Sequence, residues 1–137
     1  MIFVDSNIPM YLTGSDERLK IDAQRALERL TGDRRPLVTS SEVLQELLHR
    51  YVSSGRREAI EPVFDTLRAI VDQVFPVEEA DILAAKDLVH AHPELSSRDA
   101  VHVAVMRHHQ ITKILSFDRG FDTVTGIMRL PAPDRGD

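Results

Sequence analysis

The stretch Ile2-Phe3-Val4-Asp5-Ser6-Asn7 places a short apolar run directly before an acidic residue. An apolar run of this length predicts a short buried strand that ends at Asp5. Ligands of open parallel α/β sheets bind outside the carboxyl ends of the strands, so Asp5 is a candidate functional residue. A structural role as a helix N-cap fits the sequence around Asp5 equally well.

Short apolar runs of the same kind recur along the chain and alternate with longer helical segments. We expect strands at residues 2–4, 37–39, 74–77, 113–116 and 127–130. We expect helices at residues 5–12, 16–31, 40–54, 57–71, 78–91 and 97–109. This alternation predicts an α/β fold in which helices cover both faces of a mainly parallel sheet, giving a three-layer α/β/α sandwich.

Two segments carry more specific expectations. Pro76 cannot donate a backbone hydrogen bond, so the strand that contains it is expected at an edge or at its own end. The helix at 97–109 is apolar nearly all round between Ala100 and Met106, which predicts that it is buried.

The 137 residues are enough for one domain with one hydrophobic core, which we expect to span residues 1–130. The proline-rich, polar segment 131–137 is expected to be a flexible tail. No stretch is apolar enough for a membrane span, and no targeting signal is recognisable at the N-terminus. The chain contains no cysteine, which excludes disulfide bonds and thiolate metal ligands. A cytoplasmic protein fits these features.

The net charge of −5 argues against broad, nonspecific coating of nucleic acids, because proteins that do this are usually basic. It does not exclude a nuclease, since an acidic metal site itself contributes several negative charges. Individual arginines could still hold phosphate groups, although most of them are expected to be solvated surface residues. The candidates are Arg34, Arg35, Arg50, Arg56, Arg57, Arg98, Arg107 and Arg119.

Acidic residues follow the predicted strands or open the next helices. Besides Asp5, they are Glu42 and Glu46 after the second strand, Asp99 at the start of the buried helix, and Asp118 after the strand at 113–116. Their positions predict that they meet at the carboxyl edge of the sheet.

Structural roles compete with this interpretation. Ser96 and Asp99 could form a capping box, and Asp118 could start the turn before Gly120. Thr39 and Glu42 also have capping-box spacing, which favours a structural role for Glu42. Glu46 is therefore the better candidate for chemistry from this helix.

Several carboxylates at close range repel one another by roughly 3 kcal/mol for each pair at about 5 Å and an effective dielectric of about 20. Such a cluster must bind a cation or become partly protonated. With oxygen ligands alone, Mg²⁺ or Mn²⁺ is the expected ion. An ion of this kind suits phosphodiester hydrolysis, because it activates water and neutralises charge on the leaving oxygen.

Four motifs resemble those of the PIN domain family, in the same order along the chain. The segment 2–7 resembles the opening strand and its aspartate. The segments 40–47, 97–104 and 114–121 resemble the second, third and fourth motifs, with Glu46, Asp99 and Asp118 at their acidic positions. The motifs span nearly the whole chain, and its length matches the single-domain VapC-type toxins of toxin–antitoxin pairs.

The resemblance implies a PIN-like fold and Mg²⁺- or Mn²⁺-dependent endoribonuclease activity on RNA. It implies that Asp5 and Asp99 are the main metal ligands and that Glu46 and Asp118 complete the catalytic site. Asn7 and Ser116 stand beside these acids and could orient them by hydrogen bonds. The family also implies a cognate antitoxin that covers or enters the active site, and a homodimer.

Three points remain open from the sequence. His102 lies one helical turn after Asp99, so we expect it to bond Asp99 or another polar group of the core. A binding module that has kept the fold without activity would share these motifs. A phosphoacceptor receiver domain is less compatible, because it needs a lysine near the end of a late strand, whereas Lys113 precedes its strand and Arg129 is a poor substitute.

Overall fold

The computed structural model of the chain describes residues 1–32 and 34–131, so the predicted flexible tail beyond Pro131 lies outside the described residues. The strands are β1 (Ile2–Val4), β2 (Leu37–Ser40), β3 (Gln73–Phe75), β4 (Lys113–Leu115) and β5 (Met128–Leu130). The α-helices are α1 (Asn7–Thr13), α2 (Glu17–Thr31), α3 (Ser41–Ser53), α4 (Ile60–Ile70), α5 (Glu79–Ala91) and α6 (Ser97–His108). Two short 3₁₀ segments, η1 (Arg57–Ala59) and η2 (Arg119–Thr123), complete the pattern.

The five strands form one parallel sheet in the order β3-β2-β1-β4-β5. β1 is central, and Phe3 is in register with Val38 of β2 on one side and with Ile114 of β4 on the other. Along the chain, β2 and then β3 follow on one side of β1. The chain then crosses to the other side of β1, where β4 and β5 follow. The strand order therefore reverses between β1 and β4, and this is the point where parallel α/β sheets bind ligands.

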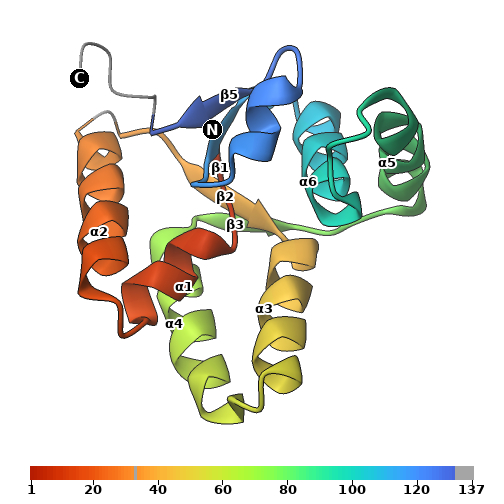
Figure 1. Cartoon of the computed structure of the whole chain (residues 1–137). Coiled ribbons are helices and arrows are strands. Elements are labelled where there is room, and N and C mark those ends of the chain that lie inside the picture. Colours follow the sequence, from red (N-terminus) through yellow and green to blue (C-terminus); the bar gives the residue numbers. More distant parts are fainter. Residues whose placement is uncertain (33, 132–137) are drawn as a thin grey trace.

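The helices are divided by the same reversal. Crossover connections between parallel strands are right-handed. Helices that connect the strands in one direction across the sheet therefore cover one face, and helices that connect them in the other direction cover the opposite face. Figure 1 shows α1 to α4 grouped together, while α5 and α6 form a separate pair. The predicted α/β sandwich with a central parallel sheet is confirmed.

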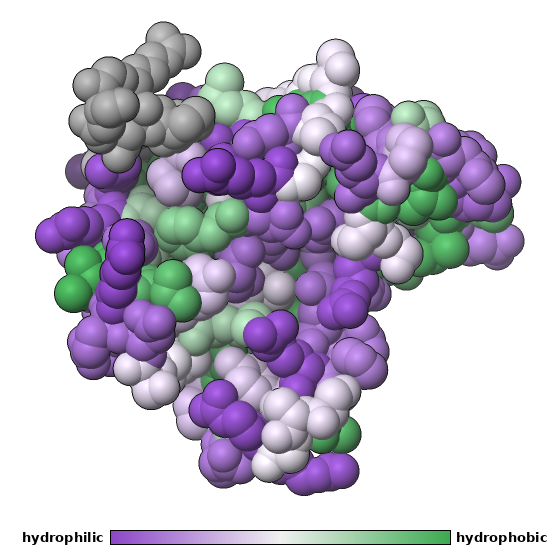
Figure 2. All heavy atoms as spheres, in the orientation of Figure 1, coloured by the Kyte–Doolittle hydropathy of each residue, from purple (hydrophilic) through white to green (hydrophobic). Residues whose placement is uncertain are grey.

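The core lies around β1 and α6. All three residues of β1 are buried, and so are Ile114 and Leu115 of β4. In α6, Ala100 and the residues from 102 to 106 are buried, which confirms the expectation for an apolar helix. On the face shown in Figure 2, strongly hydrophobic residues gather where α5 lies, in agreement with the exposed side chains of Ile82 and Leu83.

Two predicted segments differ in detail from the structure. The helix expected at 57–71 begins as η1 and continues as α4, with Pro62 in the first turn, where its missing N–H group is tolerated. The helix expected at 5–12 begins at Asn7, so Asp5 is outside it. Pro76 follows β3, and β3 is an edge strand, as its proline predicted. No helix in the described part of the chain is long and apolar enough to cross a membrane.

The buried position of Ile114 gives a prediction for stability. Ile114 is fully buried in β4, so Ile114→Ala should lower the free energy of unfolding by about 2–5 kcal/mol, through lost transfer energy and the cavity that remains. The matched control is Ile82→Ala on the exposed surface of α5, which should change this free energy by about 0.5 kcal/mol or less. Urea denaturation measures both. Equal effects of the two substitutions would contradict the assigned core.

Candidate active site

The four acids predicted from the sequence line one cavity of about 350 Å³ at the carboxyl edge of the sheet. Asp5 follows β1, Asp118 follows β4, Glu46 lies in α3, and Asp99 lies in the first turn of α6. The cavity is thus built from four separate elements around the point where the strand order reverses. The predicted convergence of these side chains is present in the structure, while their catalytic roles remain a prediction.

Asp5 is buried and held by several donors. Its Oδ1 accepts a hydrogen bond from the backbone N–H of Ser6 at 2.7 Å, and its Oδ2 accepts one from Ser116 Oγ at 2.6 Å. Asn7 Nδ2 lies 3.5 Å from the same Oδ2. The residue before α1 is Ser6, so Asp5 does not act as an N-cap. Its carboxylate belongs to the cavity.

Ser116 and Asn7 connect the loops that follow β1 and β4. Asn7 Nδ2 donates to Ser116 Oγ at 3.2 Å, and Asn7 Oδ1 accepts the backbone N–H of Phe117 at 3.3 Å. Ser116 Oγ also accepts the backbone N–H of Asp118 at 3.0 Å. These bonds link Asp5 to the loop that carries Asp118, and the role of Asn7 and Ser116 in orienting the acids of an active site stays a prediction.

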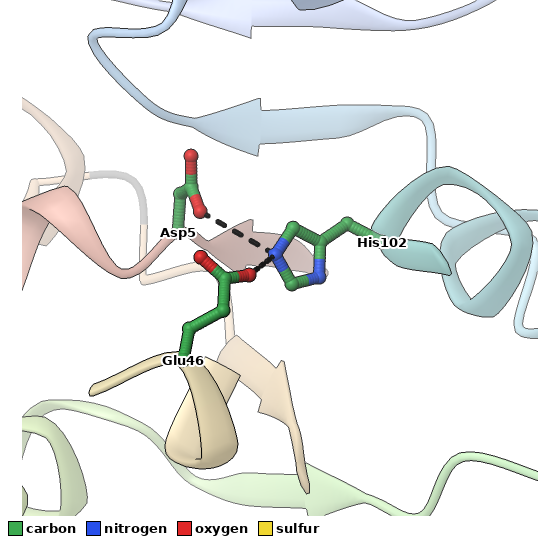
Figure 3. A group of neighbouring side chains, drawn as sticks. All are labelled: Asp5, Glu46 and His102. Carbon is green, nitrogen blue, oxygen red and sulfur yellow. Dashed lines mark hydrogen bonds and ion pairs between the residues drawn. The ribbon is translucent and has the colours of Figure 1, made fainter. Parts of the chain in front are cut away.

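Glu46 and Asp5 are bridged by His102, as Figure 3 shows. The Nε2 atom of this fully buried histidine is hydrogen-bonded to Glu46 Oε1 and lies 3.7 Å from Asp5 Oδ1. Ser6 Oγ donates to the other oxygen of Glu46 at 3.1 Å. The sequence predicted a polar partner for His102 within the core, and the structure identifies that partner as Glu46.

Burial and neighbouring groups shift the pKa values of His102 and Asp5. Burial lowers the pKa of His102, but the hydrogen bond to Glu46 and the charge of Asp5 raise it by more, so the net shift is upward. Burial also raises the pKa of Asp5, and this effect exceeds the opposing influence of His102 and Ser116. The raised pKa favours the protonated form of the His102 ring, which lies between the buried carboxyl group of Asp5 and the partly buried one of Glu46.

The capping box predicted for Thr39 and Glu42 is wrong. α3 begins after Ser40, and Thr39 is still part of β2, where its Oγ1 donates to the carbonyl oxygen of Val4 at 2.9 Å. Glu42 lies in the first turn of α3, and partial burial raises its pKa. Glu46, and not Glu42, lines the cavity. The catalytic role of Glu46 stays a prediction, and its support is now its place in the cavity rather than a capping role for Glu42.

The carboxyl groups of Asp99 and Asp118 lie close together in the same cavity. Ser96 Oγ accepts the backbone N–H of Asp99 at 3.1 Å, which caps α6 and leaves the Asp99 carboxyl group in the cavity. Asp118 Oδ1 accepts the backbone N–H of Gly120 at 2.9 Å, so its expected turn role coexists with its place in the cavity. A side chain at Gly120 would come within 3.1 Å of Asp118 Oδ1. The loop is thus closely packed against the acids.

Burial, a hydrogen bond with Asp118 and the charges of Asp5 and Asp118 raise the pKa of Asp99 to about 8. Such a shift means that the cavity cannot hold all its carboxylates ionised without a compensating positive charge. A set of carboxylate oxygens with this property fits a hard divalent cation such as Mg²⁺ or Mn²⁺.

Comparison with known proteins agrees with this geometry. A family model for the PIN domain matches residues 2–127. The chain belongs to the PIN domain family. It is 55% identical over 130 residues to a VapC ribonuclease of Mycobacterium bovis, an alignment that covers 95% of this chain and 99% of the relative.

Solved structures of the PIN fold are similar throughout their length. The crystal structure of VapC20 from Mycobacterium tuberculosis, a sarcin-ricin loop cleaving toxin, is 27% identical with a TM-score of 0.68, and the match covers 87% of this chain and 91% of that one. A toxin–antitoxin complex from Klebsiella pneumoniae has a TM-score of 0.64 at 17% identity, covering 93% of this chain and 96% of the other, which shows the shared fold.

Sequence reasoning did not assign several other residues to this PIN-domain cavity. Met10, Tyr11 and Phe117 form part of its wall, and Arg50 contributes a basic side chain. Arg50 follows Glu46 by four residues on α3, so helical spacing could have placed both on one face. The aromatic residues had no comparable signal in the sequence.

The raised pKa of Asp99 predicts a pH-dependent effect of Asp99→Asn on metal-free protein. In the unfolded chain this carboxyl group ionises near its ordinary value of 3.8, whereas the folded protein holds the proton up to about pH 8. The folded state therefore binds the proton more tightly, and wild type loses stability as the pH rises between these values. Asparagine does not titrate, so Asp99→Asn does not show this decrease in stability.

Linkage between these two pKa values amounts to about 4 kcal/mol over three pH units, so the melting temperature of Asp99→Asn relative to wild type should increase by roughly 10 °C or more between pH 5 and pH 8. Thermal unfolding in EDTA, followed by circular dichroism, measures this difference. Asp65→Asn, on the exposed surface of α4, is the control and should show no such trend. A difference that stays constant across this pH range would contradict the assigned environment of Asp99.

Proposed function

We propose that this PIN domain is a Mg²⁺- or Mn²⁺-dependent endoribonuclease whose catalytic acids are Asp5, Glu46, Asp99 and Asp118. The observation that carries the proposal is that all four acids line one cavity at the carboxyl edge of the sheet. Membership of the family and the 55% identity to a VapC ribonuclease support the same activity.

Asp5 and Asp99 would be the main ligands of the ion, and Glu46 and Asp118 would complete the site. A bound divalent cation would polarise the scissile phosphate, activate water and neutralise charge on the leaving oxygen. The raised pKa of Asp99 implies that loading the site at neutral pH displaces a proton from its carboxyl group.

The surrounding residues of the chain keep these acids in position. Ser116 and Asn7 hold Asp5 from the loop after β4 and from α1. Ser6 and His102 bind opposite oxygens of Glu46, so that its carboxylate is fixed on both sides. Orientation by such partners tunes the affinity of a metal site and the basicity of its ligands.

We also propose that the enzyme acts in the cytoplasm as the toxin of a type II toxin–antitoxin pair. Its cognate antitoxin would cover or enter the acidic cavity, and the toxin would form a homodimer. The proposal is supported by the relatedness of the full chain to a VapC ribonuclease, since the alignment covers 99% of that relative.

The alternatives predict other properties for the same residues. A receiver domain needs a free lysine beside its acids, but Lys113 opens β4, and the guanidinium group of Arg129 is bonded to Asp122 at 2.9 and 3.1 Å. A binding module without activity does not require four acids around one cavity. Both alternatives predict that no RNA is cleaved.

Asp5→Asn and Asp99→Asn should each reduce RNA cleavage by more than ~100-fold. Loss of a hydrogen-bond partner of a metal ligand costs ~10–100-fold, and loss of a ligand itself should cost more. The reason is that each substitution removes a proposed ligand. Cleavage of a mixed pool of cellular RNA with Mg²⁺ or Mn²⁺, followed by sequencing of the new ends, measures the activity.

Circular dichroism establishes that the variants are folded, and Asp65→Asn serves as a control that removes the same charge from the surface of α4. Wild type should be active with either ion and inactive in EDTA. Failure of wild type to cleave any RNA of the pool, or equal cleavage by Asp99→Asn, would contradict the proposed activity.

A further inference from the structure

A second cavity of about 310 Å³ adjoins the acidic one, and we call it the side cavity. Met10, Tyr11 and Arg50 line both cavities, so the two cavities are neighbours beside α1 and α3. The volume of the side cavity falls at the lower end of the range for pockets that hold small ligands. This size suits one unit of a polymer better than a longer segment.

Arg50 occupies the boundary between the two cavities. Its side chain is exposed and has no hydrogen-bond or ion-pair partner within residues 1–32 and 34–131. Arg56, at the far side of the side cavity, differs, since it lies 4.0 Å from Glu58 and its guanidinium group packs over Tyr51 at 5.7 Å. Arg50 is therefore the basic group that remains available to a ligand.

A guanidinium group with no partner beside an acidic metal site is suited to a phosphate group, which it can bind through two hydrogen bonds. Tyr11, which lines both cavities, packs at a tilt against Phe117, with ring centroids 5.4 Å apart. Aromatic rings in such a position can stack on bases or sugars of a single strand. Phosphate binding and stacking are both needed to hold a nucleotide.

The surface chemistry also favours RNA over an apolar protein segment. In Figure 2 most residues over α1 and α3 are hydrophilic or weakly coloured. Leu48 and Val52 of α3 are exposed, but neither lines the side cavity. A helix that docks through an apolar stripe would need a continuous hydrophobic groove.

We infer that the side cavity is the subsite for the nucleotide one step beyond the pair that flanks the scissile phosphate, with Arg50 binding the phosphate that links this nucleotide to that pair. This inference rests on the proposed ribonuclease activity. It assigns Arg50 as a substrate-binding residue and predicts that the enzyme reads one nucleotide beyond that pair on one side.

The test compares three RNA substrates, one short and two long, that share a cleavage site mapped with wild type. The short one ends at the nucleotides that flank the scissile bond, and the long ones carry one further nucleotide on the 5′ or the 3′ side. For wild type, extension on one side should raise kcat/KM by about tenfold, the factor expected for one charge-assisted hydrogen bond.

Arg50→Gln should lose this gain mainly through a higher KM, so that the ratio of kcat/KM for the long and the short substrate falls towards one. Arg50→Lys keeps the charge without the bidentate geometry and should retain part of the gain. The matched control is Arg68→Gln, which removes the same charge from the exposed surface of α4 and should behave as wild type.

Three results would overturn the subsite. The gain on extension could survive in Arg50→Gln, or cleavage of short and long substrates could fall equally. Arg50→Gln could also cleave both substrates normally and lose only inhibition by the antitoxin, which would make the side cavity a protein-binding site. If wild type cleaves no RNA at all, the proposed function and the subsite both fail. The comparison of wild type with Asp99→Asn distinguishes this outcome from the other three.

Discussion

Repulsion between carboxyl groups at the reversal point of the sheet is the constraint on which the rest of the site depends. Asp5 and Asp99 are both buried, and the charge of Asp5 helps to raise the pKa of Asp99. Because folding gains nothing from bringing like charges together, other interactions must stabilise this arrangement. The surrounding hydrogen bonds and the buried imidazole ring supply part of that stabilisation, and a cation would supply the rest.

The parallel sheet explains why these residues meet. Since β1 and β4 are neighbours and run in the same direction, the residues that follow them emerge at one edge. Ser116 therefore reaches Asp5 across 111 positions of sequence, and its hydroxyl group holds both Asp5 and the loop of Asp118. α3 and α6 begin at this same edge, which brings Glu46 and Asp99 to the cavity. Elements that form from local sequence patterns thus bring together residues that are far apart in the sequence.

The sequence predicted most of this architecture because each element carries its own hydrophobic pattern, and the strand ends then located the acids. Side-chain partners were harder to predict. The spacing of Thr39 and Glu42 suggested a capping box, but Thr39 extends β2 and bonds Val4 instead. The contact of His102 with Glu46 depends on how α6 packs against α3, which no local pattern encodes. The role of Arg50 at the boundary of two cavities also required the folded surface.

The central claim is that the cavity formed by Asp5, Glu46, Asp99 and Asp118 is a divalent metal site. A crystal structure of the protein soaked in Mn²⁺, with anomalous scattering used to locate the ion, tests this claim most directly. We predict an anomalous peak inside the cavity, with carboxylate oxygens of Asp5 and Asp99 among the ligands. A cavity without a peak in crystals of protein that cleaves RNA with Mn²⁺, or an ion bound elsewhere on the chain, would contradict it.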